Sequence, residues 1–149
     1  DQKEWDKVIA INLTSVYAMT HAVFAKMKAA GKGRIVNIAS VAAKRGGGLL
    51  GTSAYAASKA GVIGLTKAVA REGAAYGVAC NAVCPSYTLT PMTALMDDAK
   101  KEKILSTIPL KRGADPKEIA NVILFYASDL ASFVTGEISD VDGGVTMDG

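Results

Sequence analysis

Tyr55 and Lys59 stand four residues apart in the segment YAASK, and Ser40 lies upstream of them. At this spacing two side chains share one face of a helix. A free tyrosine has a pKa of about 10, and a nearby ammonium group favours the phenolate. Such a phenol can act as an acid or a base near neutral pH, and a serine hydroxyl can hold a substrate oxygen. These residue types suit reversible proton transfer at an alcohol or a carbonyl, with a cofactor that takes or gives the hydride.

A second candidate motif, GGGLLG at residues 46–51, fits the dinucleotide-binding pattern G-x-G-x-x-G. That pattern needs its first glycine directly after a strand and an acidic residue at the end of the next strand. Gly46 instead follows the nearest predicted strand by several residues, and Glu72, the acid at the expected spacing, falls inside a predicted helix. We therefore interpret these glycines as a flexible loop beside the site.

The elements that must position these residues alternate between helix and strand. Asn12 lies on an apolar stripe at helical spacing, and Gly61 and Gly64 within the second long helix predict close approach of another helix. Helices are predicted at residues 1–30, 53–76 and 115–127, short helical pieces at 91–106, buried strands at 34–39, 78–84 and 137–141, and a loop at 40–52. Apolar strands joined by helices predict an α/β fold with a parallel sheet. Ligands bind at the carboxyl ends of such strands, and Ser40 directly follows one of them.

Composition excludes several classes of function. The 149 residues carry a formal net charge of +3, with scattered Lys and Arg and no basic run, so no nucleic-acid partner is expected. No apolar run approaches the roughly 20 residues of a membrane span, so no membrane is expected.

Cys80 and Cys84 fall on one face of a predicted strand, roughly 13 Å apart, which is too far for a disulfide. A metal site is not expected either, because His21 is the one histidine. Reduced thiols fit a cytoplasmic protein.

Several ordered motifs together resemble the short-chain dehydrogenase/reductase family. Asn12, Ser40, Tyr55 and Lys59 are similar to its Asn-Ser-Tyr-Lys tetrad, and IVNIAS resembles its strand that ends in the catalytic serine. NAVCPSYTLTPM resembles its N-x-V-x-P-G-x-x-x-T segment, and GEISDVDGG its closing T-G-x-x-x-x-V-D-G-G. The resemblance extends along the whole chain. It implies an incomplete Rossmann-type doubly wound parallel sheet, of which this chain supplies the last three strands and their flanking helices.

The resemblance also implies a role for each tetrad residue. Tyr55 would be the general acid/base. Lys59 would favour the ionised phenol and hold the nicotinamide ribose, and Ser40 would position the substrate carbonyl or alcohol. Asn12 would hold a water that links Lys59 to solvent.

The implied cofactor is NAD or NADP, and the preference between them cannot be inferred from these residues. Besides Tyr55 and Lys59, the implied cofactor-binding residues are Pro85, Ser86, Thr88 and Thr90. Pro85 and Ser86 would wall the nicotinamide pocket, while Thr88, by its backbone, and Thr90 would bind the carboxamide. The implied partners are a small alcohol or ketone substrate and further copies of the chain, in a homodimer or homotetramer formed through the helices at 5–30 and 53–76.

Three departures from the family pattern stand out. Ser86 occupies a position where the family usually has glycine, which would strain a serine if φ is positive there. The loop between Ser40 and Tyr55 is slightly longer than the commonest spacing. The family's T-G-x-x-x-G-x-G fingerprint and N-N-A-G segment are absent and belong upstream of Asp1. We therefore expect residues 1–149 to form the C-terminal portion of a single Rossmann-type domain.

Within the family, 3-oxoacyl-carrier-protein reductases and sugar or polyol dehydrogenases fit about equally well. The alternative is a non-catalytic truncated relative that only oligomerises through its helices; the coding sequence upstream of Asp1 would distinguish the two. A serine hydrolase that uses Ser40 is not favoured, because a G-x-S-x-G elbow is missing and His21 has no evident triad partner.

Overall fold

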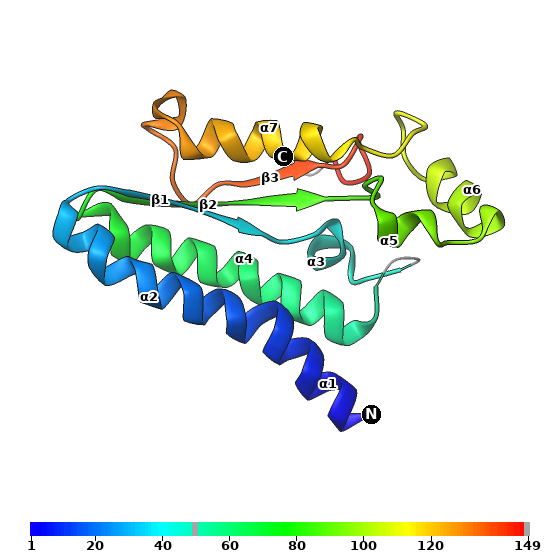
Figure 1. Ribbon diagram of the computed structural model, residues 1–149, viewed down its shortest axis with the longest axis horizontal. Coiled ribbons are helices and arrows are strands. Elements are labelled where there is room, and N and C mark those ends of the chain that lie inside the picture. Colours follow the sequence, from blue (N-terminus) through cyan, green and yellow to red (C-terminus); the bar gives the residue numbers. More distant parts are fainter. Residues whose placement is uncertain (49–50, 148–149) are drawn as a thin grey trace.

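A computed structural model describes residues 1–48 and 51–147 of the chain. Within these residues a three-stranded parallel sheet has the order β1 (Gly33–Ile38), β2 (Val78–Pro85) and β3 (Ile138–Val141). Helices α2 and α4 cover one face of the sheet, and α7 covers the other (Figure 1). The α/β class and the parallel pairing expected from the sequence are confirmed. The carboxyl ends of the strands point toward α3, α5 and α6.

The N-terminal helix is continuous but mixed in type. It comprises α1 (Gln2–Ile9), a π-helical turn η1 (Ala10–Thr14) and α2 (Ser15–Ala30). Leu13 and Val16 pack on the core, but Trp5 is 41% exposed and most of the helix is uncovered. By length and composition alone, residues 2–30 could cross a membrane. The expectation that no stretch has the length and apolarity of a membrane span was therefore wrong for these residues. A helix that packs within a protein can satisfy the same two criteria.

Helix α4 (Ser53–Ala74) packs against β2 and begins at the N-cap Thr52, whose side chain accepts a hydrogen bond from the Tyr55 N–H. A Cβ on Gly61 would come within 2.7 Å of the Leu13 side chain, so at this position the neighbouring helix does approach closely. A Cβ on Gly64 would meet nothing within 4 Å. The prediction of a close helix approach thus holds within the chain for only one of the two glycines.

The core between α4 and the sheet contains both cysteines. Cys80 packs with Val69 of α4, and Cys84 packs with Val62, about two turns earlier in the same helix. The two thiols share a face of β2, as expected, and within residues 1–48 and 51–147 neither is in a disulfide. Beside them, the buried amide of Asn37 donates a 2.9 Å hydrogen bond to the hydroxyl of Thr66, which ties β1 to α4.

The segment after β1 differs from the loop expected at residues 40–52. A short helix, α3 (Val41–Arg45), begins directly after Ser40 and ends at Gly46, which has a φ of 76°. The remaining helices are α5 (Pro91–Ala94), α6 (Asp98–Ser106), α7 (Pro116–Ala127) and the 3₁₀ turn η2 (Asp129–Ala131). Helix α7 has the expected capping box, in which the side chains of Asp115 and Glu118 each accept a backbone N–H.

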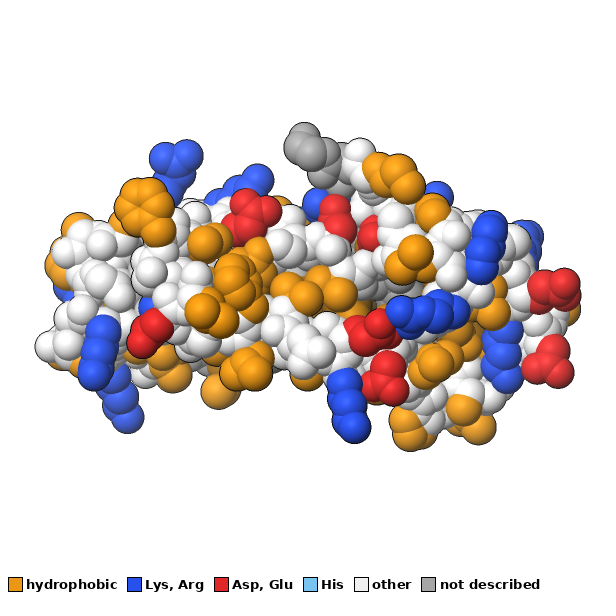
Figure 2. Space-filling model, turned by 90° about the horizontal axis from the view of Figure 1, so that it is seen from above, with side chains coloured by type: hydrophobic (Ala, Val, Ile, Leu, Met, Phe, Trp, Pro, Cys, Tyr) orange, Lys and Arg blue, Asp and Glu red, His pale blue; other side chains and the backbone are white. Residues whose placement is uncertain are grey.

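The face that includes α7 is chemically mixed. Acidic and basic side chains are interspersed there with hydrophobic ones and do not gather into one basic patch (Figure 2). Leu124, Leu130 and Phe133 are among the exposed apolar side chains of this part of the chain. The surface charge visible on this face gives no support for nucleic-acid binding.

Candidate active site

Ser40 lies at the carboxyl end of β1 and is fixed there by the helix it caps. Its φ of −171° is extended, and its Oγ accepts a 3.1 Å hydrogen bond from the N–H of Ala42. The side chain is buried except on its pocket side. Because the cap uses a lone pair of Oγ, the hydroxyl proton is left to donate to a substrate oxygen.

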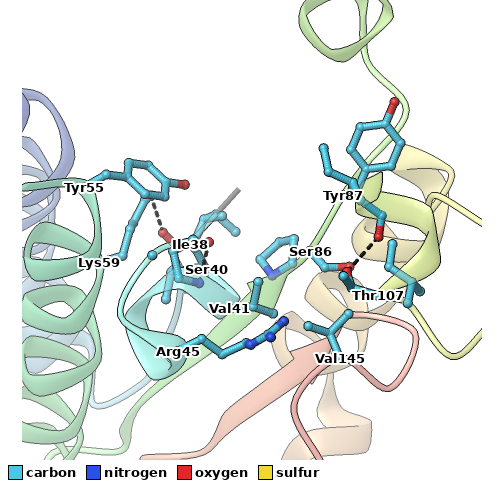
Figure 3. Close-up of a pocket in the computed structure, with 17 residues that line it drawn as sticks. Ile38, Ser40, Val41, Arg45, Tyr55, Lys59, Ser86, Tyr87, Thr107 and Val145 are labelled. Atoms are coloured by element: carbon cyan, nitrogen blue, oxygen red, sulfur yellow. Dashed lines mark hydrogen bonds between the residues drawn. The ribbon is translucent and has the colours of Figure 1, made fainter. Parts of the chain in front are cut away.

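Tyr55 and Lys59 occupy one face near the start of α4. The Lys59 Nζ lies 5.8 Å from the centroid of the Tyr55 ring and donates a 2.9 Å hydrogen bond to the carbonyl oxygen of Ile38. In Figure 3 the two side chains lie beside each other, with Ser40 next to them. The helical spacing therefore brings the amine beside the phenol.

Burial changes the acid–base behaviour of Lys59. Removal of the amine from water lowers its pKa from the ordinary value of 10.5, and interaction with Cys84 opposes this in part. The folded chain therefore holds the charged amine at a cost, which the hydrogen bond to Ile38 offsets only partly.

The three side chains line one pocket of about 380 Å³ at the carboxyl edge of the sheet. Its walls come from the segment after β1, from α4, from the segment after β2 and from α6. The lining residues are Ile38, Ala39, Ser40, Val41, Ala42, Arg45, Gly47, Gly48, Tyr55, Lys59, Pro85, Ser86, Tyr87, Ile104, Thr107, Ile108 and Val145. A mostly apolar pocket with a few convergent polar groups is the usual form of a small-molecule site.

Of the candidate cofactor-binding residues at the end of β2 and after it, some line the pocket and others do not. Pro85 and Ser86 line the pocket, whereas Thr88 and Thr90 are not among its lining residues. The hydroxyl of Thr90 caps α5 by accepting a hydrogen bond from the N–H of Thr93. The strain considered for Ser86 is absent: among the described residues Lys111 is the one non-glycine with a positive φ.

Asn12 belongs to a different cavity. It lies in the π-helical turn η1, and π-helical turns occur frequently at functional sites. With Lys59 and residues of β1 it lines a second cavity, of about 440 Å³. Lys59 therefore lies between the two cavities, with Ser40 and Tyr55 on one side and Asn12 on the other.

The other candidates do not join the site as chemical groups. Gly47 and Gly48 line the pocket with positive φ, in keeping with a turn beside the site; residues 49–50 of the GGGLLG segment lie outside the described residues. His21 is exposed on α2 against Tyr17, outside the pocket, so Ser40 has no histidine beside it. No cluster of His, Cys, Asp or Glu suited to a metal occurs in residues 1–48 and 51–147.

Sequence reasoning missed several pocket residues. Arg45 was hidden in the supposed loop. Ile104 of α6 and the two residues directly after its end, Thr107 and Ile108, also line the pocket. Val145 follows the Gly143–Gly144 turn after β3. The rule that ligands bind beyond the carboxyl ends of parallel strands was the available signal for Val145; no local pattern marks the residues of α6.

The fold and the site define an α/β protein with a small-molecule pocket at the carboxyl edge of a parallel sheet, and comparison with known proteins identifies its family. The family model described as enoyl-(acyl carrier protein) reductase matches residues 1–146. The chain is 42% identical to the (3R)-3-hydroxyacyl-CoA dehydrogenase of Rattus norvegicus over 98% of its own length and 56% of that protein. It is 44% identical to the acetoacetyl-CoA reductase of Rhizobium meliloti, over 95% of this chain and 58% of that protein.

Comparison with solved structures supports the same family. A predicted NAD(P)-dependent gluconate 5-dehydrogenase from Beutenbergia cavernae, with NADP bound at low occupancy, superposes with a TM-score of 0.92 at 40% identity, over 97% of this chain and 58% of that one. The chain belongs to the enoyl-(acyl carrier protein) reductase family of short-chain dehydrogenases/reductases. It spans a little more than half the length of the relatives that it matches.

Proposed function

We propose that this chain is the catalytic, C-terminal portion of a single Rossmann-type domain that interconverts a secondary alcohol and a ketone with NAD or NADP. One observation carries the proposal: Ser40, Tyr55 and Lys59 surround one pocket at the carboxyl edge of a parallel sheet. The relatives support it, because they include an acetoacetyl-CoA reductase and a hydroxyacyl-CoA dehydrogenase.

In the reducing direction Tyr55 donates its phenolic proton to the substrate carbonyl oxygen. The hydroxyl of Ser40 donates a hydrogen bond to the same oxygen, and its own cap keeps it oriented. The positive charge of Lys59 stabilises the phenolate that Tyr55 becomes. The nicotinamide cofactor, when bound, supplies the hydride to the carbonyl carbon. In the oxidising direction the phenolate takes the proton back from the alcohol.

The pocket residues fit the nicotinamide end of such a cofactor. The Lys59 amine has hydrogens to spare beyond its bond to Ile38, so with Tyr55 it can hold ribose hydroxyls. Pro85 and Ser86 supply a wall for the planar ring. Thr88 and Thr90 follow in the chain and would hold the carboxamide, Thr88 through its backbone. The described residues leave the choice between NAD and NADP open.

Asn12 would complete the proton path. Lys59 lines both the pocket that contains Tyr55 and the cavity that contains Asn12. A water held by the Asn12 amide would connect the amine to solvent, so that the proton lost by Tyr55 is replaced through Lys59. The π-helical turn at Asn12 supports this role, because such turns occur frequently at functional sites.

The test is nucleotide titration and turnover in the protein expressed at its full encoded length. We expect NADH or NADPH to bind wild type and Tyr55→Phe with similar Kd. Ketone turnover should fall about 100- to 10,000-fold in Tyr55→Phe, the usual contribution of a general acid. Retention of most activity in Tyr55→Phe would refute the assignment. A wild-type protein that binds neither nucleotide would favour the non-catalytic helix–sheet module instead.

We also propose that two copies associate through α1–α2 and α4, as a homodimer or within a homotetramer. The exposed apolar side chains Ile11, Tyr17 and Met19 on the first helix, and the open space at Gly64 on α4, support a partner there. Gly64→Glu should halve the mass in solution, measured by light scattering, while the chain stays folded. Ala99→Glu, which adds the same charge on exposed α6, should not. An unchanged mass in Gly64→Glu would contradict this surface.

The place of action that we propose is the cytoplasm, without a membrane. The length and apolarity of residues 2–30 are accounted for by packing on α4 and on a second copy. The two buried cysteines outside any disulfide support a reducing compartment.

A further inference from the structure

Two neighbouring basic residues end helix α3, and they behave differently. The Nζ of Lys44 forms a 2.7 Å ion pair with Asp140 of β3, and both side chains are largely buried. This pair holds α3 against the sheet. Arg45, the next residue, is exposed to the pocket side and lines the pocket with Ser40 and Tyr55.

The charged side chains that line the pocket have the same sign. Of its lining residues only Arg45 and Lys59 carry a full charge, both positive, and Asp and Glu are absent from that set. The amine of Lys59 is already engaged by Ile38 and lies beside Tyr55. Within residues 1–48 and 51–147, by contrast, the Arg45 guanidinium makes no hydrogen bond or ion pair.

The position of Arg45 separates it from the reacting groups. In Figure 3 its side chain extends from α3 toward Val145, while Tyr55 and Lys59 lie on the other side of Ser40 and Val41. A basic residue in the last turn of a helix also interacts favourably with the helix C-terminus. That effect does not require the side chain to face a pocket, so it does not account for where Arg45 lies.

We infer that Arg45 binds an anionic group of the substrate, a carboxylate or a phosphate, at a distance from the carbonyl that Tyr55 protonates; this rests on the proposed function. A guanidinium forms paired, charge-assisted hydrogen bonds with such groups. The largely apolar walls strengthen these bonds once the substrate displaces water. The substrate class is then an anionic ketone or alcohol, either a keto acid or a thioester whose carrier brings a phosphate.

Three substrates with the same reacting ketone distinguish the sources. Acetoacetate carries a carboxylate, methyl acetoacetate is neutral, and acetoacetyl-CoA carries phosphates. In the protein at its full encoded length, Arg45→Gln should lower kcat/KM about 10- to 100-fold for one of the two anionic substrates. The neutral ester should change less than about threefold in the same variant, since it lacks the charge. Loss on acetoacetate identifies a carboxylate, and loss on acetoacetyl-CoA identifies a phosphate.

Matched variants separate recognition from general effects. Arg45→Lys, which keeps the charge, should recover part of the loss, and Arg71→Gln, an exposed arginine of α4 outside the pocket, should have no effect. An equal effect of Arg45→Gln on all three substrates, or none on any, overturns the inference while leaving the catalytic role of Tyr55 untouched. If the wild-type protein reduces none of the three substrates, the binding of acetoacetate and acetoacetyl-CoA is measured by calorimetry. Binding that Arg45→Gln abolishes supports the inference, and absence of binding to wild type overturns it.

Discussion

The Nζ atom of Lys59 lies 5.8 Å from the centroid of the Tyr55 ring, and the carbonyl oxygen of Ile38 holds it there at 2.9 Å. The last residue of β1 thus positions a charge that belongs to α4. Because burial lowers the pKa of Lys59, the folded chain disfavours the charged amine. A charge kept at a cost beside a phenol is the expected mark of a site arranged for proton transfer.

Lys59→Met should therefore lose activity and gain stability. The unfolded chain binds the Lys59 proton more tightly than the folded chain does, so the charged amine destabilises the fold at pH 7. This destabilisation declines as the pH rises from the lowered pKa toward 10.5. We expect Lys59→Met to melt at a higher temperature than wild type at pH 7. The difference in melting temperature should shrink as the pH rises toward 10.5. Turnover should fall about 100-fold or more.

The matched control is Lys67→Met, which removes an exposed charge from the same helix. It should leave both the melting temperature and turnover near those of wild type. A lower melting temperature for Lys59→Met at pH 7 would show that the hydrogen bond to Ile38 outweighs the burial of the charge.

Ser40 has two separable roles, which two substitutions distinguish. Ser40→Ala removes both the proton donor and the cap of α3, so stability should fall by about 1 kcal/mol and turnover by about 100-fold. Ser40→Gly removes the hydroxyl but is tolerated at an N-cap, at a cost of a few tenths of a kcal/mol. It should lose turnover to the same extent as Ser40→Ala. Thermal melts and steady-state kinetics check this, and a Gly variant with near wild-type turnover would restrict Ser40 to a structural role.

Local signals allowed much of the fold to be predicted. The Asp115–Pro116 start of α7 satisfies its own backbone groups, so a few neighbouring residues specify it. The apolar run at β2 is buried on both faces, as its composition indicated. The same expectation was wrong for β1, where only Ile35 and Asn37 are buried and Ile38 is 41% exposed. The spacing of Tyr55 and Lys59 needed only a helix to bring the two side chains together.

What escaped prediction depends on short elements and on distant packing. Helix α3 has five residues, too few for periodicity to reveal, so Arg45 was hidden in a supposed loop. Ile108 follows α6 and lines the pocket through packing with Tyr87, which is distant in the sequence. Asn12 was expected on a buried stripe and as a member of the tetrad; it is half-buried, in a π-helical turn, and shares with Lys59 a cavity that Ser40 and Tyr55 do not line.

The thiol of Cys80 should be protected in the folded chain. Burial raises its pKa to about 11, from the ordinary value of 9.0, with a smaller opposing effect from Thr66. The unfolded chain ionises this thiol first, so stability should fall as the pH rises from about 9 to about 11. In Cys84→Ala, which leaves Cys80 as the one thiol, a disulfide reagent at pH 8 should react only after denaturant is added. Rapid labelling of the folded variant would show that β2 opens locally.

The ion pair between Arg112 and Glu118 should make the start of α7 sensitive to acid. Two hydrogen bonds from the guanidinium, at 2.6 and 2.7 Å, and a backbone N–H from Asp115 lower the pKa of Glu118 from 4.5 to about 2. The stability that this pair contributes is present above pH 4.5 and is lost as the pH falls toward 2. Glu118→Gln keeps an acceptor for the capping box but removes the charge.

Urea denaturation should show Glu118→Gln less stable than wild type at pH 7, with the difference vanishing near pH 2. Arg112→Gln should follow the same course, and the double variant should be no less stable than either single one, because both remove the same interaction. The side chains are exposed, so 1 M salt should reduce the difference at pH 7. A difference that persists unchanged at pH 2 would mean that the cap, and not the charge, stabilises this end of α7.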